Sequence, residues 1–175
     1  FSTQYIEKLE EEIKKQKEKL TQLATKITEN RENYAQVLSV LIQDKLAVLE
    51  LPKARFEIRI TQKELSSNGA DNVEFMISTN VSEDLKPLAK VASGGVISRV
   101  MLAIKSIFAQ NDDIDTVIFD EIDTGISGKA SQSVAEEIVE LSKSHQVIVI
   151  THQAIIASKA DKHFYVRKSQ EDETK

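Results

Sequence analysis

The feature that most constrains the fold is a heptad repeat over the first fifty residues. An apolar or aromatic side chain recurs every seven residues, at Ile6, Ile13, Leu20, Ile27, Tyr34, Leu41 and Val48. A second set at the complementary offset is Leu9, Gln16, Leu23, Asn30, Val37, Asp44 and Leu51. An apolar seam with a period of 3.5 residues is typical of a supercoiled helix. We therefore predict a coiled-coil arm helix over residues 1–51, which Pro52 ends.

The polar members of the second set, Gln16, Asn30 and Asp44, keep another interpretation open. In it, the segment is a long amphipathic helix that lies on a globular domain. A coiled-coil helix needs a partner helix, and the sequence holds no second heptad segment. Either the partner belongs to another chain, or the sequence is a piece of a longer protein.

Composition limits the classes of function. The chain of 175 residues has no Cys, which excludes disulfides, zinc–thiolate clusters and thiol nucleophiles. No apolar run approaches the roughly 20 residues that a membrane span needs, and we expect a cytoplasmic protein. The net charge is −5 and no basic cluster stands out. If DNA is a partner, this segment is not expected to supply the main grip on it.

Residues 52–168 are predicted to form one α/β domain, followed by a polar tail over 169–175. Apolar and polar residues alternate over 55–60 and 73–78, as in half-buried strands, and a polar turn over 66–71 separates them. We expect an antiparallel pair.

Strands and helices alternate in the rest of the domain. We predict strands over 116–119, 146–150 and 163–166, and helices over 96–110, 129–144 and 154–160. Because the strands are mostly uninterrupted apolar runs, this order indicates a mostly parallel sheet with helices on both faces.

The strongest chemical signal is the strand 116–119, which ends directly in Asp120 and Glu121. In open α/β folds, the carboxyl edge of a parallel sheet is where ligands bind. Two adjacent acids there are costly without a cation, and Mg²⁺ beside phosphates supplies one. We expect Asp120 near the metal and Glu121 activating the attacking water. The simpler alternative is an acidic strand end in a surface loop.

The strand 146–150 leads into Thr151 and His152. If the two strands are neighbours, His152 lies at the same edge as Glu121 and can sense a terminal phosphate. A single His at a strand end is more often structural, so this signal is weak by itself.

Ser93, Gly94 and Gly95 precede the predicted helix over 96–110. Glycines let the backbone approach a ligand, and a helix N-terminus is a ready anion site. Ser93 is placed to cap the helix or to contact a phosphate oxygen. Ser-Gly-Gly is also an ordinary flexible turn.

The sequence contains no phosphate loop of the form G-x-x-x-x-G-K-[ST]. The segment 125–131 has Gly125, Gly128 and Lys129, but neither its glycine spacing nor the residue after the lysine fits. The metal, base and sensor positions of a nucleoside triphosphatase are therefore present without the cradle for the β-phosphate.

Taken in order, Ser-Gly-Gly before a helix, Val-Ile-Phe-Asp-Glu, and Ile-Thr-His resemble the signature motif, the Walker B strand and the His switch of ABC-type ATPases. The coiled coil points to the SMC-like branch. The strings over 85–95, 118–128 and 145–152 are similar to the RecN family of bacterial DNA repair proteins, and so is the stretch 52–56.

This resemblance implies the C-terminal lobe of an ABC/SMC-type P-loop ATPase head and the returning helix of its arm. It implies that ATP and Mg²⁺ bind, that the N-terminal half of the same head supplies the phosphate loop, and that two heads form an ATP-dependent homodimer. Asp120 would assist Mg²⁺, Glu121 would polarise the water and His152 would sense the γ-phosphate. Ser93, Gly94 and Gly95 would act on the nucleotide of the opposite head. RecN-like proteins act with DNA in recombinational repair of double-strand breaks, which implies a bacterial, nucleoid-associated protein.

Two positions depart from the wider pattern. Val96 stands where the signature usually has Glu, and Ser127 stands where the loop after Walker B usually has Asp. RecN relatives share the second departure but not the first. Two other functions stay open: a chromosome-organising SMC or ABC-type ATPase, and a coiled-coil scaffold without enzymatic activity.

Overall fold

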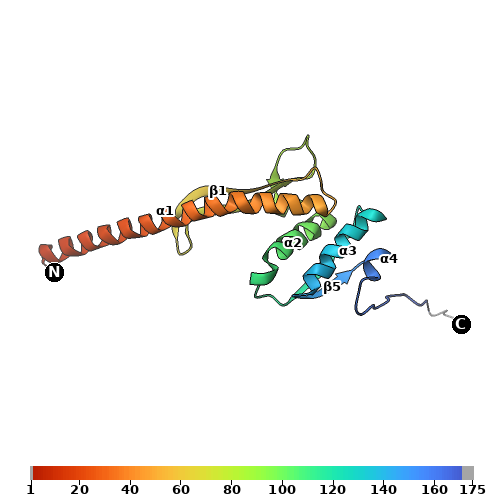
Figure 1. The fold of residues 1–175 in the computed structure, drawn as a ribbon. Coiled ribbons are helices and arrows are strands. Elements are labelled where there is room, and N and C mark those ends of the chain that lie inside the picture. The colour runs from red at the N-terminus through yellow and green to blue at the C-terminus, as the bar shows by residue number, and fades with distance from the viewer. Residues whose placement is uncertain (1, 171–175) are drawn as a thin grey trace. The chain divides into compact units, whose positions relative to one another are not determined.

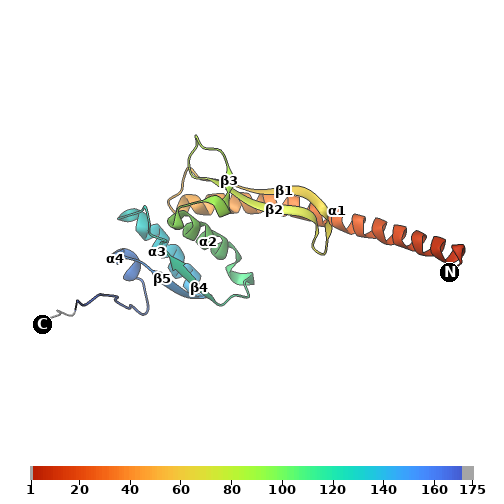
Figure 2. The same cartoon turned by 180° about the vertical axis from the view of Figure 1, so that it is seen from behind.

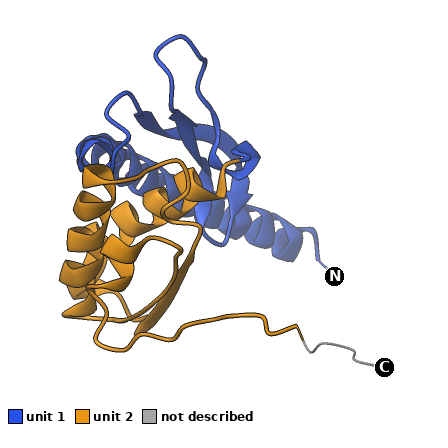
Figure 3. Ribbon diagram, turned by 90° about the vertical axis from the view of Figure 1, so that its right-hand side faces the viewer, with its two compact units in different colours: residues 1–92 blue, residues 93–175 orange. Residues whose placement is uncertain are grey.

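The computed structural model describes residues 2–170, and its fold is shown in Figures 1 and 2. The chain forms two compact units, residues 1–92 and residues 93–175 (Figure 3). The predicted domains divide the chain at residues 51 and 168 instead, and that division stays a prediction about the complete protein.

The first unit begins with one long helix, α1, over Thr3–Val48. Ser2 caps it, because its hydroxyl accepts a hydrogen bond from the backbone N–H of Tyr5 (3.3 Å). The helix ends three residues before the predicted boundary, and Glu50 follows in the left-handed region with φ 66°. Among the described residues, no helix is long and apolar enough to cross a membrane.

The predicted antiparallel pair is present as a hairpin of β1 (Arg55–Ser66) and β2 (Gly69–Ser78). Both strands are longer than predicted, and the turn between them is correspondingly tighter. A two-residue strand, β3 (Lys86–Pro87), pairs with β2, and the short 3-10 helix η1 (Leu88–Lys90) follows.

Asp71 of β2 holds the hairpin to α1 at the turn end. Its side chain is 4% exposed, and it accepts hydrogen bonds from the Thr28 hydroxyl (2.9 Å) and from Nη1 of Arg31 (3.0 Å). Nη2 of Arg31 donates to the carbonyl of Asn68 (2.6 Å). Burying a carboxylate is costly unless it is paired in this way. The contact therefore fixes the position of the hairpin turn along α1.

Two further side chains of α1 accept hydrogen bonds from the backbone of β1. The Ser39 hydroxyl accepts from the N–H of Ile58 (3.1 Å), and Oε1 of Gln43 accepts from the N–H of Phe56 (3.0 Å). These N–H groups lie on the strand edge that does not pair with β2, and α1 satisfies them as a neighbouring strand would.

The heptad seam of α1 is not the main face that packs on the hairpin, although Ile27 lies close to Gly69 at the hairpin turn. The buried apolar residues of α1 are Ala24, Ala35, Ile42 and Leu46, none of which belongs to the seam. Large seam residues are exposed along the whole helix, at Ile6, Leu9, Ile13, Leu20, Leu23, Ile27, Tyr34, Val37, Leu41 and Val48. The helix therefore has two apolar faces, and most of the large seam side chains are exposed within the first unit.

The second unit contains a parallel pair of strands with helices beside it. Its elements are α2 (Gly94–Phe108), the 3-10 helix η2 (Ala109–Asn111), β4 (Thr116–Asp120), α3 (Lys129–Ser142), β5 (Gln146–Ile150) and α4 (Ala154–Ala157). β4 and β5 are parallel neighbours, with Thr116 opposite Gln146 and Asp120 opposite Ile150. The prediction of an α/β fold with a parallel sheet is confirmed.

Only one face of this sheet is covered, which corrects the prediction of helices on both faces. Val117 and Phe119 are buried on the side of α2 and α3, whereas Ile118, Ile148 and Ile150 are 64%, 44% and 55% exposed. Side chains alternate between the two faces of a strand, so these three isoleucines lie on the opposite face. No described element of the second unit covers them.

The predicted strand over 163–166 is absent. These residues have no regular structure, and Phe164, Tyr165 and Val166 are 82%, 80% and 91% exposed. A strand needs a neighbour for its N–H and C=O groups, and no described strand of the second unit lies beside this segment.

The predicted helix over 154–160 is also shorter and ends at Ala157. From residue 171 on, the predicted polar tail lies outside the described residues.

A charged cluster closes the amino end of the β4–β5 sheet. Asp112 binds the Lys105 ammonium (2.6 Å) and lies 3.3 Å from Nε2 of the buried His145, whose Nδ1 is 2.8 Å from the Ser144 hydroxyl. The hydrogen bond from Lys105, followed by one from the N–H of Ile114, holds the pKa of Asp112 below its ordinary value of 3.8.

We expect D112N to lower the stability of the chain at neutral pH and to lose this effect in acid. A carboxylate with a depressed pKa stabilises the folded state above its unfolded pKa, and this contribution disappears as the pH falls through the folded pKa. The measurement is thermal unfolding, followed by circular dichroism, of wild type and D112N between pH 7 and 2.5. The gap between them should begin to narrow below about pH 4 and close as the pH falls through the lowered pKa of Asp112. D113N at the exposed neighbouring position is the control, and a gap independent of pH would contradict this role of Asp112.

Candidate functional site

The candidate site lies at the carboxyl edge of the β4–β5 sheet. Asp120 is the last residue of β4, and its partner in the register, Ile150, is the last residue of β5. Glu121 and Thr151 are therefore the first residues beyond the sheet on the same edge. The two strands are adjacent and parallel, as the sequence predicted, and both acids and His152 are exposed.

Glu121 has an unusual backbone conformation. Its φ is 59°, in the left-handed region that residues other than Gly and Asn rarely adopt, at a cost of about 1–3 kcal/mol. Its carboxylate lies against Gly94 so closely that a Cβ at Gly94 would be 1.8 Å from Oε2. Any other residue at position 94 therefore requires the Glu121 side chain to move.

The N-terminus of α2 begins two residues earlier than predicted, at Gly94, with Ser93 as its cap. The Ser93 hydroxyl accepts a hydrogen bond from the N–H of Val96 (3.3 Å). A Cβ at Gly95 would lie 2.7 Å from the carbonyl oxygen of Thr124, so this position also requires glycine. Val96, the departure from the signature pattern, is buried.

The loop after β4 is fastened to α2 by two polar side chains. Nη1 of the buried Arg99 donates to the carbonyls of Ile122 (3.2 Å) and Thr124 (2.9 Å). The Ser98 hydroxyl donates to the carbonyl of Asp120 (2.5 Å). The backbone of residues 120–124 is thus fixed relative to the N-terminal half of α2.

Asp123 fastens the same loop to the end of β5. Its side chain is 1% exposed, and Oδ2 accepts hydrogen bonds from the Thr151 hydroxyl (2.5 Å) and the N–H of His152 (3.2 Å). The same oxygen lies 3.4 Å from Nδ1 of His152. The Thr151 oxygen in turn accepts from the N–H of Gln153 (3.0 Å).

Gln153 makes a second connection between the two loops. Its Nε2 donates to the carbonyl of Ile126 (2.6 Å), and its Oε1 accepts from the hydroxyl of the fully buried Ser131 at the start of α3 (2.8 Å). The predicted site residues therefore sit on three segments that are tied together by side-chain hydrogen bonds.

The sequence assigned a connecting role to none of these residues, although Thr151 was noted as the residue before His152. One signal was available for Arg99, a lone cation within the apolar run from Val96 to Ala103. Asp123 was visible as a third acid after Asp120 and Glu121, but its burial depends on the path of the loop. Nothing in the sequence distinguishes Gln153 from an ordinary exposed polar residue.

The described residues hold no group of three or more His, Asp or Glu side chains arranged to bind a metal ion. The donor set at the sheet edge consists of the exposed Asp120, with Glu121 next to it. This fits Mg²⁺, which typically takes one or two carboxylates and completes its shell with phosphate oxygens and water.

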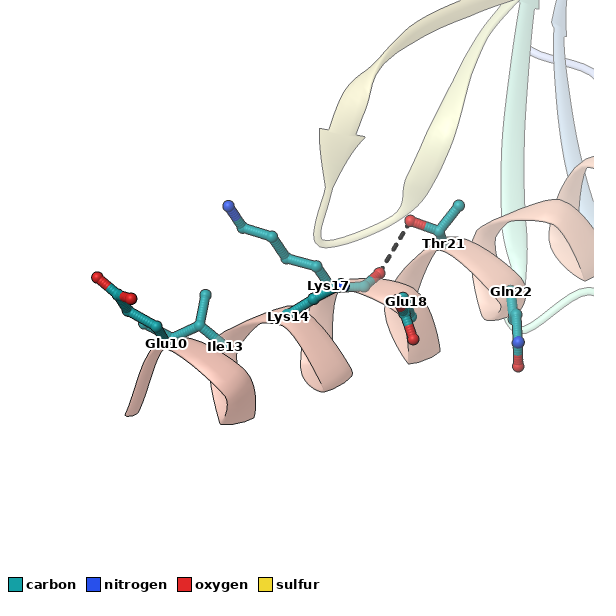
Figure 4. Close-up of a pocket in the computed structure, with 7 residues that line it drawn as sticks. All are labelled: Glu10, Ile13, Lys14, Lys17, Glu18, Thr21 and Gln22. Atoms are coloured by element: carbon teal, nitrogen blue, oxygen red, sulfur yellow. Dashed lines mark hydrogen bonds between the residues drawn. The ribbon is translucent and has the colours of Figure 1, made fainter. Parts of the chain in front are cut away.

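A hollow of about 600 Å³ lies elsewhere, on the N-terminal part of α1 (Figure 4). All of its lining residues come from that single helix, and the hydrogen bond within it joins the Thr21 hydroxyl to the Lys17 carbonyl (2.9 Å). It is a gap between neighbouring side chains of one helix and not an enclosed ligand site.

Comparison with known proteins places the chain among bacterial DNA repair proteins. It is 41% identical over 170 residues to DNA repair protein RecN of Halalkalibacterium halodurans, which covers 94% of this chain. Over 165 residues it is 41% identical to RecN of Bacillus subtilis, and over 174 residues it is 37% identical to RecN of Treponema pallidum. The chain spans only 29–30% of the length of these curated relatives. No model of a protein family matches it.

Among solved structures, the chain resembles heads of Smc proteins. The Smc head domain with a coiled coil and joint from Pyrococcus yayanosii matches with a TM-score of 0.54 and 21% identity, over 91% of this chain and 31% of that one. A Smc head bound to the C-winged helix domain of ScpA matches with a TM-score of 0.51 and 23% identity, over 74% of this chain and 38% of that one. At these identities the likeness concerns the fold, which is that of an SMC head.

The long N-terminal helix, the parallel strands and the sequence identity across nearly the whole chain agree with one another. The chain therefore belongs to the RecN family, and it corresponds to the C-terminal portion of such a protein.

Proposed function

We propose that the chain is the C-terminal part of an ATP-binding and ATP-hydrolysing, SMC-like head that acts in recombinational repair of DNA double-strand breaks. One observation carries the proposal: two parallel strands bring Asp120–Glu121 and Thr151–His152 to the same sheet edge. The names of the relatives support the repair role.

In this proposal Asp120 and Glu121 have separate roles. Asp120 would supply a carboxylate oxygen to Mg²⁺, and the bound ion would neutralise negative charge on the phosphates. Glu121 orients the attacking water and accepts its proton at a carboxylate oxygen. Glu121 directly follows β4 in a left-handed backbone conformation, and its side chain is exposed at the sheet edge.

His152 contacts the γ-phosphate as a sensor, and its exposed ring supports this assignment. Ser93, Gly94 and Gly95 contact the γ-phosphate bound to a second head. The first N–H groups of α2 and its dipole favour an anion, which supports this part of the proposal.

The N-terminal half of the same head supplies the phosphate loop and covers the bare face of the β4–β5 sheet. Three exposed isoleucines, Ile118, Ile148 and Ile150, support this part of the proposal. Covering these isoleucines with another layer of the protein removes apolar surface from water, which lowers the free energy.

The remaining partners follow from the same assignment. Two heads form an ATP-dependent homodimer, and DNA is bound through the complete protein, since the net charge of this chain is −5. The protein acts in the bacterial cytoplasm, associated with the nucleoid.

The test compares this chain with the complete protein from the same gene. We expect Mg²⁺-dependent ATP hydrolysis by the complete protein and none by the chain alone, because the chain has no phosphate loop. Phosphate release at saturating ATP measures both. If the complete protein does not hydrolyse ATP, the coiled-coil scaffold without enzymatic activity becomes the better assignment. Robust turnover by the isolated chain would contradict the proposed division of the head.

A further inference from the structure

We propose that Asp123 is the positioning residue that holds His152 at the phosphate, with Thr151 as its partner; this rests on the function proposed above. A buried carboxylate is retained where hydrogen bonds and charge offset the cost of removing it from water. All three polar neighbours of Oδ2 belong to two consecutive residues, Thr151 and His152.

The contacts act on both the backbone and the ring of His152. The hydrogen bond from its N–H to Asp123 fixes the chain where it leaves β5 (3.2 Å). The carboxylate beside Nδ1, at 3.4 Å, favours a proton on that nitrogen and leaves Nε2 free for a ligand. The ring itself is 79% exposed, so no packing holds it in place.

The rest of the network explains why Asp123 is a firm support. The carbonyls on either side of it, from Ile122 and Thr124, both accept hydrogen bonds from Arg99 of α2. Asp123 therefore links the position of α2, whose N-terminus carries Ser93 and the two glycines, to the position of His152. No other described carboxylate of the second unit is as deeply buried.

The experiment uses the complete protein and a double-mutant cycle. We expect D123A to lower kcat for ATP about 10- to 100-fold, the loss that is typical when the carboxylate that orients a metal-binding His is removed. H152A should have a similar effect, and D123A/H152A should be no slower than H152A alone, because Asp123 acts through His152. ADP lacks the γ-phosphate, so its affinity should not change, whereas general damage to the site would weaken ADP binding as well.

Two variants of Thr151 make the test independent of the stability of D123A. T151V removes the hydroxyl but keeps the shape, and it should repeat the loss of kcat and the non-additivity with H152A. T151S keeps the hydroxyl, and its kcat should be close to that of the wild type. The matched control is D112A, the same change in the cluster at the opposite end of the sheet, which should lower thermal stability and leave kcat unchanged.

The outcomes separate this inference from the proposed function. Additive losses in the cycle, or wild-type kcat in both D123A and T151V, would contradict the role of Asp123. ATP hydrolysis by the wild-type protein would still support the proposed ATPase function. A wild-type protein that does not hydrolyse ATP would remove the proposed function and this inference with it.

Discussion

In the complete protein, E121Q should lower kcat for ATP hydrolysis by about 10²- to 10⁴-fold, as is typical when a general base is removed. Glutamine has the same shape as glutamate and can hold a water, but it cannot accept the proton. Glu121 is exposed just beyond the end of β4, so the change removes no buried side chain. ATP binding should therefore be kept, and ATP-bound head dimers should accumulate.

Single-turnover hydrolysis and size-exclusion chromatography with ATP measure the two effects. E136Q is the matched control, since Glu136 is an exposed residue of α3 that accepts a hydrogen bond from Nε2 of Gln132 on the same helix (3.3 Å). Normal turnover by E121Q would remove Glu121 from its proposed role, whatever happens to dimerisation.

The second large effect is expected from S93R, which should abolish ATP-dependent association of the heads. The Arg side chain would fill the space in front of the α2 N-terminus, where we propose that the phosphate of the opposite head binds. It would also remove the hydroxyl that caps α2 through the N–H of Val96. The measurement is head association as a function of ATP concentration.

S93A separates these two consequences. It loses the cap, which costs about 1 kcal/mol, but leaves the space free. Association should then weaken less than about tenfold. Equal loss in S93A and S93R would mean that the cap, and not access to the phosphate, explains the effect.

The sequence predicted the sheet edge well because local patterns determine it. The apolar runs that become β4 and β5 were placed to within one residue of their observed ends, and the Ser-Gly-Gly segment precedes a helix as expected. A continuous apolar run indicates burial on both faces of a strand. Here it predicted burial on a face that is in fact exposed, since Ile118 and Ile148 are exposed.

The failures concern structure that depends on distant parts of the chain. Residues 163–166 have the composition of a strand but no described strand to pair with. The burial of Asp123 depends on how the loop after β4 meets the end of β5, thirty residues later. On α1, the heptad repeat conceals the face that packs on the hairpin, because Thr28, Ser39 and Gln43 are polar and do not look like core residues.

That second face of α1 has a mechanical consequence. Thr28, Arg31, Ser39 and Gln43 are bonded to fixed positions on the hairpin, and the N-terminal part of the helix projects beyond it (Figure 1). Sliding α1 by one turn, about 5.4 Å, or rotating it about its axis would break all four connections together. When the projecting end is pulled or twisted, we therefore expect α1 and the hairpin to move together as one rigid body.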